Sequence, residues 1–288
     1  MNDSASSLPR LPSRGADSHK GDFGRVLIVA GSRGMAGAAV LAGRACLRGG
    51  AGLVTVATPA SQQVVVACGS PCYMTIAAAE DSEGRIHPSA VSPLASEAMR
   101  RGVVVLGPGC GPAPALASLV ETLIREHPGN LVIDADALNV ITPAVLASRK
   151  SGGGTVITPH PGEFARLAGE ETSRVQADRQ AMASRLARET GAVVLLKGRG
   201  TVVADAGRVF INATGNPGMA TGGSGDVLSG FLGALLGQGM APYEAAVLGA
   251  HLHGLAGDIA SGDFTQPGMI ASDLVDYLPA AMARHARC

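Results

Sequence analysis

Six short runs of apolar, mostly β-branched residues recur along the chain, and longer segments of helical character separate them. The runs cover residues 25–31, 53–58, 103–107, 131–134, 155–159 and 192–198. Because these runs are apolar on both faces, they are typical of strands buried within a parallel sheet. Helical segments are expected at residues 36–50, 115–127, 162–168 and 174–190. The pattern predicts an α/β fold with a central, mostly parallel sheet flanked by helices on both faces.

Residues 201–212 differ from the other strand-like runs, because a short turn at Asp205, Ala206 and Gly207 joins two of them directly. Such a pair predicts a hairpin at an edge of the sheet. From Gly225 onward the apolar residues repeat at helical spacing. No linker-like change in composition follows residue 22. We therefore expect a flexible tail over residues 1–22 and a single domain over residues 23–288.

The charge balance argues for a small-molecule partner. The chain has 23 Lys and Arg residues against 23 Asp and Glu residues, so nothing favours nucleic acid or an anionic membrane surface. Five cysteines without CxxC spacing indicate reduced thiols rather than disulfides or a zinc site. Residues 1–22 lack the apolar core of a signal peptide. We expect a cytoplasmic protein, and the charged fraction of 16% leaves room for a homo-oligomer.

The stretch "NATGNPGMATGGSGDVLSG", residues 212–230, is rich in glycine and runs directly into an apolar helix. Gly222, Gly223 and Gly225 precede that helix and are suited to present backbone N–H groups to an anion such as phosphate. Asp226 would repel phosphate at this place, so it is better explained as a base acting on a hydroxyl that is to be phosphorylated. The alternative is that Asp226 only stabilises the start of its own helix. The chain has no GxxxxGK[ST] motif, which excludes a Walker-type phosphate loop.

Other polar residues follow the predicted strands, where open α/β sheets bind their ligands. Asp134, Asp136 and Asn139 are suited either to hold hydrated Mg²⁺ or a sugar hydroxyl, or to cap a helix; Asn139 is a candidate substrate contact. His160 lies between two prolines and is either aimed at a ligand or packed in a turn. Lys197 ends an apolar strand and either meets phosphate or extends its amine into solvent. Their placement after successive strands favours a common site.

Several of these motifs occur together and in one order. The glycine-rich stretch, "DADALN", "TPHPGE", the "KG" at residues 197–198 and "GSRGMAGAAVLAGRACLRGGAGLVTVATP" resemble the ADP/ATP-dependent NAD(P)H-hydrate dehydratase family over residues 20–283. The resemblance implies a ribokinase-like fold and a repair reaction. In that family ADP or ATP phosphorylates the hydroxyl of hydrated NADH or NADPH (NADHX or NADPHX), and loss of phosphate and a proton restores the cofactor.

The resemblance also implies roles for individual residues. The hydrate site would contain Ala38, Gly111, His160 and Asp226, with Asp226 as the base that activates the hydroxyl. The adenine nucleotide would be bound by Lys197, Gly198, Arg199, Gly200, Thr201 and Gly225. The transferring phosphoryl group would be held by Asn216, Gly222, Gly223 and Gly225, and Mg²⁺ would offset its charge. Met35 stands where relatives often have Tyr, which leaves the packing of that wall open.

Bacterial members of the family include ADP users, which favours ADP here. Larger relatives carry an attached epimerase domain, and since about 20 residues precede the first strand, an epimerase would be a separate protein. Two rival functions stay open. One is a ribokinase-like kinase that phosphorylates a small alcohol such as a vitamin precursor; the pair "TPHPGE" and "NPGMATGGSGD" fits the dehydratases better. The other is a catalytically silent nucleotide-binding regulator, which would not need a carboxylate at Asp226.

Overall fold

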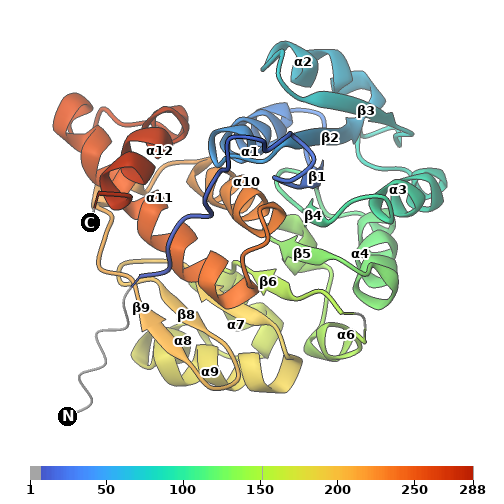
Figure 1. The fold of residues 1–288 in the computed structure, drawn as a ribbon. Coiled ribbons are helices and arrows are strands. Elements are labelled where there is room, and N and C mark those ends of the chain that lie inside the picture. Colours follow the sequence, from blue (N-terminus) through green and yellow to red (C-terminus); the bar gives the residue numbers. More distant parts are fainter. Residues whose placement is uncertain (1–7, 151, 288) are drawn as a thin grey trace.

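A nine-stranded sheet forms the centre of the computed structural model, which describes residues 8–150 and 152–287 (Figure 1). The strands lie in the order β3-β2-β1-β4-β5-β6-β7-β8-β9. Strands β1 to β7 pair in parallel, and β8 and β9 are antiparallel to their neighbours. Their bounds are β1 (Arg25–Val29), β2 (Leu53–Pro59), β3 (Met74–Ala78), β4 (Val103–Leu106), β5 (Asn130–Ile133), β6 (Thr155–Ile157), β7 (Val193–Leu196), β8 (Val202–Ala204) and β9 (Val209–Ile211).

Helices cover both faces of this sheet because alternate strand residues point to opposite sides. Val26 and Ile28 of β1 pack with α1, α10, α11 and α12, whereas Leu27 and Val29 pack with α3, α4, α7 and α9 (Figure 1). The bounds are α1 (Ala36–Arg48), α2 (Gln63–Cys68), α3 (Val91–Ala98), α4 (Pro114–Glu126), α5 (Asp136–Asn139), α6 (Pro143–Ala147), α7 (Pro161–Ala168), α8 (Thr172–Ala177), α9 (Arg179–Thr190), α10 (Ser224–Gly237), α11 (Pro242–Phe264) and α12 (Ala271–His285). The predicted α/β class and flanked parallel sheet are confirmed.

All six predicted strands and the edge hairpin, β8 and β9, are present. The prediction missed β3, which pairs with β2 at the opposite edge and carries the weakly strand-like sequence "MTIAA". It also wrongly continued one helix over residues 174–190. The chain forms two helices there, because Asp178 leaves the helical conformation and its carboxylate accepts the Ala181 amide at 3.0 Å to cap α9.

Part of the predicted flexible tail contacts the rest of the domain. Leu8 and Leu11 pack against the apolar core that contains residues of α1, α10, α11 and α12, and His285 Nε2 lies 3.0 Å from the carbonyl oxygen of Pro9. The guanidinium of Arg14 stacks on the ring of Phe23. These contacts place residues 8–14 against the domain. Residues 1–7 of the predicted tail lie outside the described residues, and the flexibility predicted for residues 1–22 stays a prediction.

The sequence predicts reduced cysteines and no membrane surface as a partner. Cys46, Cys68, Cys72 and Cys110 are free thiols, and Cys288 lies outside the described residues. No helix in the described part of the chain combines the length and the apolar character needed to cross a membrane.

The contact between α1 and α10 depends on Gly230. A Cβ atom at this position would lie 2.0 Å from the backbone oxygen of Ala42 in α1. Gly230→Ala should therefore push the two helices apart and lower the free energy of unfolding by about 1–3 kcal/mol, as measured by urea denaturation. Gly262→Ala is the matched control, because Gly262 lies in α11 with open space around its Cβ position. Equal stability of the two variants would contradict the prediction.

Candidate active site

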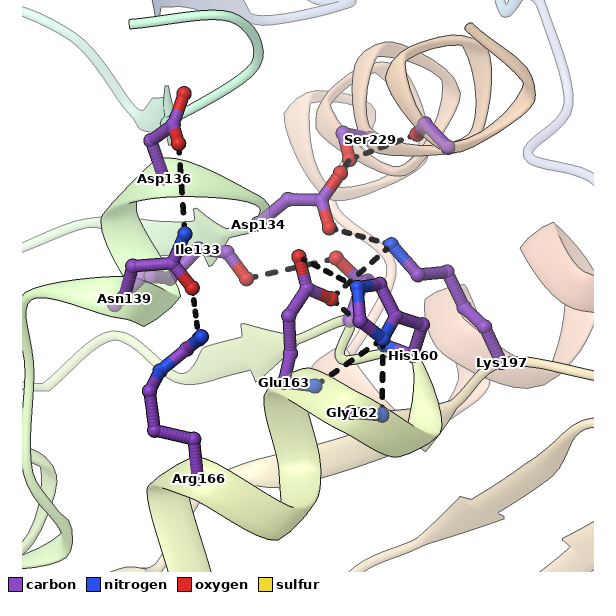
Figure 2. Close-up of polar contacts among 12 residues, drawn as sticks. Ile133, Asp134, Asp136, Asn139, His160, Gly162, Glu163, Arg166, Lys197 and Ser229 are labelled. Carbon is purple, nitrogen blue, oxygen red and sulfur yellow. Dashed lines mark hydrogen bonds and ion pairs between the residues drawn. The ribbon is translucent and has the colours of Figure 1, made fainter. Parts of the chain in front are cut away.

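Four side chains meet beyond the carboxyl ends of β5, β6 and β7, next to the first turns of α10 (Figure 2). Lys197 Nζ donates to Asp134 Oδ1 at 2.7 Å, and Ser229 Oγ lies 2.6 Å from the other oxygen of Asp134. The Asp134 carboxylate, 1% exposed, thus has a partner on each oxygen. Glu163 Oε2 lies 3.9 Å from Lys197 Nζ. Asp134 therefore joins the end of β7 to α10, and its predicted alternative role in holding hydrated Mg²⁺ or a sugar hydroxyl stays a prediction.

Lys197 is held as a cation in this cluster. Its side chain is 21% exposed, and burial alone would lower its pKa. The charges of Asp134 and Glu163 outweigh that effect, so the pKa of Lys197 is raised. A fixed positive charge at this edge of the sheet is suited to bind a phosphate group.

Asp226 lies in the first turn of α10, whose N-cap is Gly223 in the left-handed region at φ 98°. Its carboxylate makes no hydrogen bond or ion pair with any other described residue. Burial, followed by the negative charge of Asp134, raises the pKa of Asp226 to about 7, although Lys197 acts in the opposite direction. A carboxyl group that titrates near neutrality is suited to take a proton from a substrate hydroxyl.

Backbone amides next to Asp226 are available for an anion. Ser224 N donates to the Thr221 carbonyl at 3.4 Å, but within residues 8–150 and 152–287 the amides of Gly222, Gly223 and Gly225 donate to no acceptor. Lys197 Nζ lies 3.2 Å from where a Cβ atom of Gly225 would be. The predicted anion cradle is thus adjacent to the Lys197 ammonium group, and its phosphate-binding role stays a prediction.

Asn216 belongs to the same glycine-rich segment but its side chain is used within the protein. Its Nδ2 donates to Asp258 Oδ1 at 3.1 Å, and its Oδ1 accepts the Gly218 amide at 2.9 Å. The other oxygen of Asp258 accepts the Gly215 amide at 2.9 Å. Asp258 therefore binds to α11 the segment that the sequence predicts to hold the phosphoryl group.

His160 is the N-cap of α7, and its two ring nitrogens make different contacts. Nδ1 accepts the amides of Gly162 and Glu163 at 3.0 and 3.1 Å, while Glu163 Oε2 accepts the His160 amide at 2.7 Å (Figure 2). With Nδ1 as an acceptor, Nε2 carries the proton of the neutral ring. Nε2 lies 3.6 Å from Glu163 Oε1, and because the side chain as a whole is 58% exposed, the ring can also contact a ligand. Both predicted alternatives, a ligand contact and a structural turn residue, are compatible with this geometry.

The remaining predicted hydrate-site residues lie where the strand order reverses, between β1 and β4. The loops after these strands are joined by Gly31 N, which donates to the Pro108 carbonyl at 2.8 Å. Gly111, at φ 71°, donates its amide to Asp136 Oδ2 at 2.8 Å. Ala38 in α1 packs against the position of Gly109 in the same loop.

Cys110 lies in the loop after β4, and its buried thiol is 3.4 Å from the carbonyl oxygen of Val29. Burial, then the charge of Asp136 and more weakly that of Asp226, raise the pKa of its thiol to about 12. Asn139 accepts a hydrogen bond from Arg166, and its Nδ2 donates to Asp136 Oδ1 at 3.4 Å (Figure 2). Asn139 is therefore tied to α7, and its predicted substrate contact is not tested by these bonds.

Gly198 to Thr201, the predicted nucleotide-binding loop, connects β7 and β8. Gly198 and Gly200 both have positive φ, at 138° and 62°, and Thr201 Oγ1 donates to the Gly198 carbonyl at 2.9 Å. A hollow of about 330 Å³ lies between this loop and the α8–α9 junction, lined in part by Arg199, Gly200 and Ile211. A larger one of about 500 Å³ lies at the amino ends of β6 and β7 and contains none of the predicted site residues.

Comparison with known proteins shows the family to which the chain belongs. Residues 26–280 match the family model described as NAD(P)H-hydrate dehydratase. This chain belongs to the NAD(P)H-hydrate dehydratase family. It is 46% identical over 271 residues to a bifunctional NAD(P)H-hydrate repair enzyme of Moorella thermoacetica, covering 94% of this chain and 51% of that protein. The chain thus spans about half the length of the bifunctional relatives that it matches.

Two further relatives resemble the chain along most of their own length. An ADP-dependent (S)-NAD(P)H-hydrate dehydratase of Neisseria meningitidis is 38% identical over 253 residues, covering 85% of this chain and 80% of that protein. The crystal structure of an ADP/ATP-dependent NAD(P)H-hydrate dehydratase of Bacillus subtilis, co-crystallised with ATP and Mg²⁺, superposes with a TM-score of 0.83 at 28% identity, covering 98% of this chain and all of that one. A ribokinase of Thermotoga maritima superposes with a TM-score of 0.56 at 14% identity over 89% of this chain and 99% of that one. The ribokinase-like fold is therefore confirmed.

Sequence reasoning missed three residues that organise the site in this member of the family. Ser229 follows Asp226 by one helical turn, so helical spacing contained a signal for it. Glu163 lies three residues after His160, and its approach to Lys197 at 3.9 Å depends on tertiary packing that the local sequence does not indicate. Arg179, which contacts the 197–201 segment, lies in a helix that the sequence pattern merged with its neighbour, and no local motif indicates its role.

Proposed function

We propose that this chain dehydrates the S-epimer of NADHX or NADPHX, with ADP or ATP as the phosphoryl donor, and so restores NADH or NADPH. The observation that carries the proposal is the Asp226 carboxyl group, whose pKa is raised to about 7 beside unpaired backbone amides. Family membership and the names of the Neisseria and Bacillus relatives support the substrate and the donor. The kinase of a small alcohol is the less favoured rival, since the solved kinases of this fold are less similar.

In this reaction Asp226 accepts the proton of the hydroxyl group that was added to the nicotinamide ring. The hydroxyl oxygen forms a bond to the terminal phosphorus of the nucleotide, and the bond from that phosphorus to its bridging oxygen breaks. The C–O bond to the ring then breaks with inorganic phosphate as the leaving group, the ring nitrogen lone pair assists, and loss of a proton from the ring restores the reduced cofactor. Lys197 and the amides of the cradle offset phosphoryl charge, so the protein contributes orientation and electrostatic stabilisation.

Mg²⁺ fits this donor set as an ion carried by the nucleotide. Within the described residues no group of three or more His, Cys, Asp or Glu side chains is arranged to hold a metal, and Mg²⁺ at such sites is held mainly by phosphates and water. When bound there it would neutralise phosphoryl charge. Pairing with a separate epimerase, a cytoplasmic location and a homo-oligomeric state stay predictions.

The test is recovery of near-ultraviolet NADH absorbance from purified S-NADHX with Mg²⁺ and ADP, ATP or no nucleotide. We expect recovery with nucleotide only, with release of one phosphate for each NADH formed. The arm that supports the faster recovery identifies the donor. Failure with both nucleotides, in a protein that still binds them, would overturn the proposal and favour the small-alcohol kinase or the silent regulator.

A second prediction separates the two tasks of His160. His160→Ala removes both the cap of α7 and the exposed Nε2–H group, whereas His160→Asn keeps a cap acceptor and removes only the ring. If Nε2–H contacts the hydrate, both variants should raise KM for NADHX about ten-fold, the loss of one hydrogen bond, with nucleotide affinity nearly unchanged. Wild-type kinetics in His160→Asn would mean that the ring only caps the helix.

A further inference from the structure

Arg179, the first residue of α9, donates hydrogen bonds to the main chain at the predicted nucleotide-binding loop. Its Nη2 donates to the carbonyl oxygens of Leu196 and Lys197 at 2.7 and 2.9 Å, and its Nη1 donates to that of Arg199. A Cβ atom at Gly198 would lie 3.1 Å from Nη2, so glycine leaves the room that the guanidinium fills. One planar side chain thus fixes three carbonyls in a stretch of four residues.

The direction of these carbonyls determines where the neighbouring amides point. The described chain has no cis peptide bonds, and in a trans peptide the C=O and N–H groups point in opposite directions. The Leu196 peptide shows the consequence, since its carbonyl faces Arg179 while the Lys197 amide donates to Pro159 on the other side at 2.9 Å. By the same geometry the amides of Gly198 and Gly200 point away from Arg179.

Those two amides are unused within the protein. Neither Gly198 N nor Gly200 N donates to an acceptor in the described part of the chain. The loop ends beside Thr201, whose hydroxyl is already bonded to the Gly198 carbonyl at 2.9 Å. The side of the loop opposite Arg179 therefore presents two oriented donors in the residues that follow Lys197, an arrangement that suits an anionic ligand.

We propose that Arg179 is a positioning residue for nucleotide binding, which holds the Gly198 and Gly200 amides in the orientation that receives the nucleotide. This inference rests on the proposed function, because it takes the loop to be the nucleotide site. Arg179 acts through the backbone, because its guanidinium contacts carbonyl oxygens of residues 196–199. Its loss should therefore weaken nucleotide binding selectively.

The test compares Arg179→Gln, Arg179→Lys and Arg185→Gln with the wild type, using titration calorimetry with ADP and with ATP, and steady-state kinetics. Arg185 is the matched control, because it lies in the same helix and, among the residues that the structure describes, pairs only with Glu170 and Glu189. We expect Arg179→Gln to raise the Kd and KM of the nucleotide at least about ten-fold, with kcat and the KM of NADHX within about two-fold of wild type. Lys satisfies fewer carbonyls than the guanidinium fork, so Arg179→Lys should fall between the two.

Three outcomes are decisive. Unchanged nucleotide affinity in a folded Arg179→Gln, or a loss equal to that of Arg185→Gln, would overturn the positioning role while the proposed function stands. An equal loss of nucleotide and NADHX affinity would show that Arg179 stabilises the structure in general and does not position the nucleotide loop. A wild-type chain that binds neither ADP nor ATP would overturn both proposals. If Arg179→Gln does not fold, the same comparisons are made with Arg179→Lys.

Discussion

Asp226→Asn is expected to lower turnover of the hydrate by about 100- to 10,000-fold, the range for removal of a general base, while ADP and ATP still bind. Asn has nearly the same size as Asp but cannot accept a proton from the hydroxyl group. The measurement is recovery of NADH absorbance, with calorimetric titration of nucleotide in parallel. Normal turnover in Asp226→Asn would contradict the assignment of Asp226 as the base.

The pH dependence of the wild type checks the same assignment. Burial and the charge of Asp134 raise the pKa of Asp226 to about 7 from its ordinary value of 3.8. A base acts only when ionised, so kcat/KM should decline as the pH falls below about 7. The folded state also resists this ionisation, and stability is therefore lost as pH rises from the ordinary pKa to the raised one. Asp226→Asn escapes that loss, so at about pH 8 its unfolding midpoint should equal or exceed that of the wild type. A lower midpoint would show that misfolding contributes to the loss of turnover.

Lys197→Met is expected to destabilise the whole domain as well as to weaken nucleotide binding. It leaves the Asp134 carboxylate, 1% exposed, without its cation. Breaking a buried pair in this way costs about 3 kcal/mol, the lower end of the range because Lys197 is 21% exposed. The measurement is the free energy of unfolding from urea denaturation at neutral pH.

The double variant Asp134→Asn with Lys197→Met provides the control. It removes both charges, so the buried carboxylate that causes the loss is absent. We expect the double variant to regain most of the stability while nucleotide binding stays weak. Additive losses from the two substitutions would show that the pair itself is not the source of the effect.

The fold could be predicted from the sequence wherever burial leaves a local pattern. The runs that became β1, β2 and β4 to β7 are apolar on both faces, since helices cover both sides of the sheet. Strand β3 lies at an edge, where Met74 is 48% exposed, and edge strands need no such continuous apolar pattern. The break at Asp178 depends on a cap, which the apolar spacing of the two helices does not indicate.

The sequence could predict several residues of the candidate site, but it could not predict which residues contact one another there. Asp226, His160 and Lys197 stood out because their residue types are unusual at the starts of helices or the ends of strands. Their partners depend on which strands become neighbours. The bonds of Asp134 to Lys197 and to Ser229 cross the interior of the fold, and the hold of Arg179 on backbone oxygens leaves no motif in the sequence.

The Asp134 contacts determine when, during folding, the charge cluster can form. Lys197 and Ser229 lie 63 and 95 residues along the chain from Asp134, so no local segment can assemble this cluster before the long-range strand pairing is in place. A ligand that binds there selects the completed domain and stabilises all of it by mass action. A nascent or partly unfolded copy therefore lacks the assembled charge cluster, and the chemistry is confined to molecules that have finished folding.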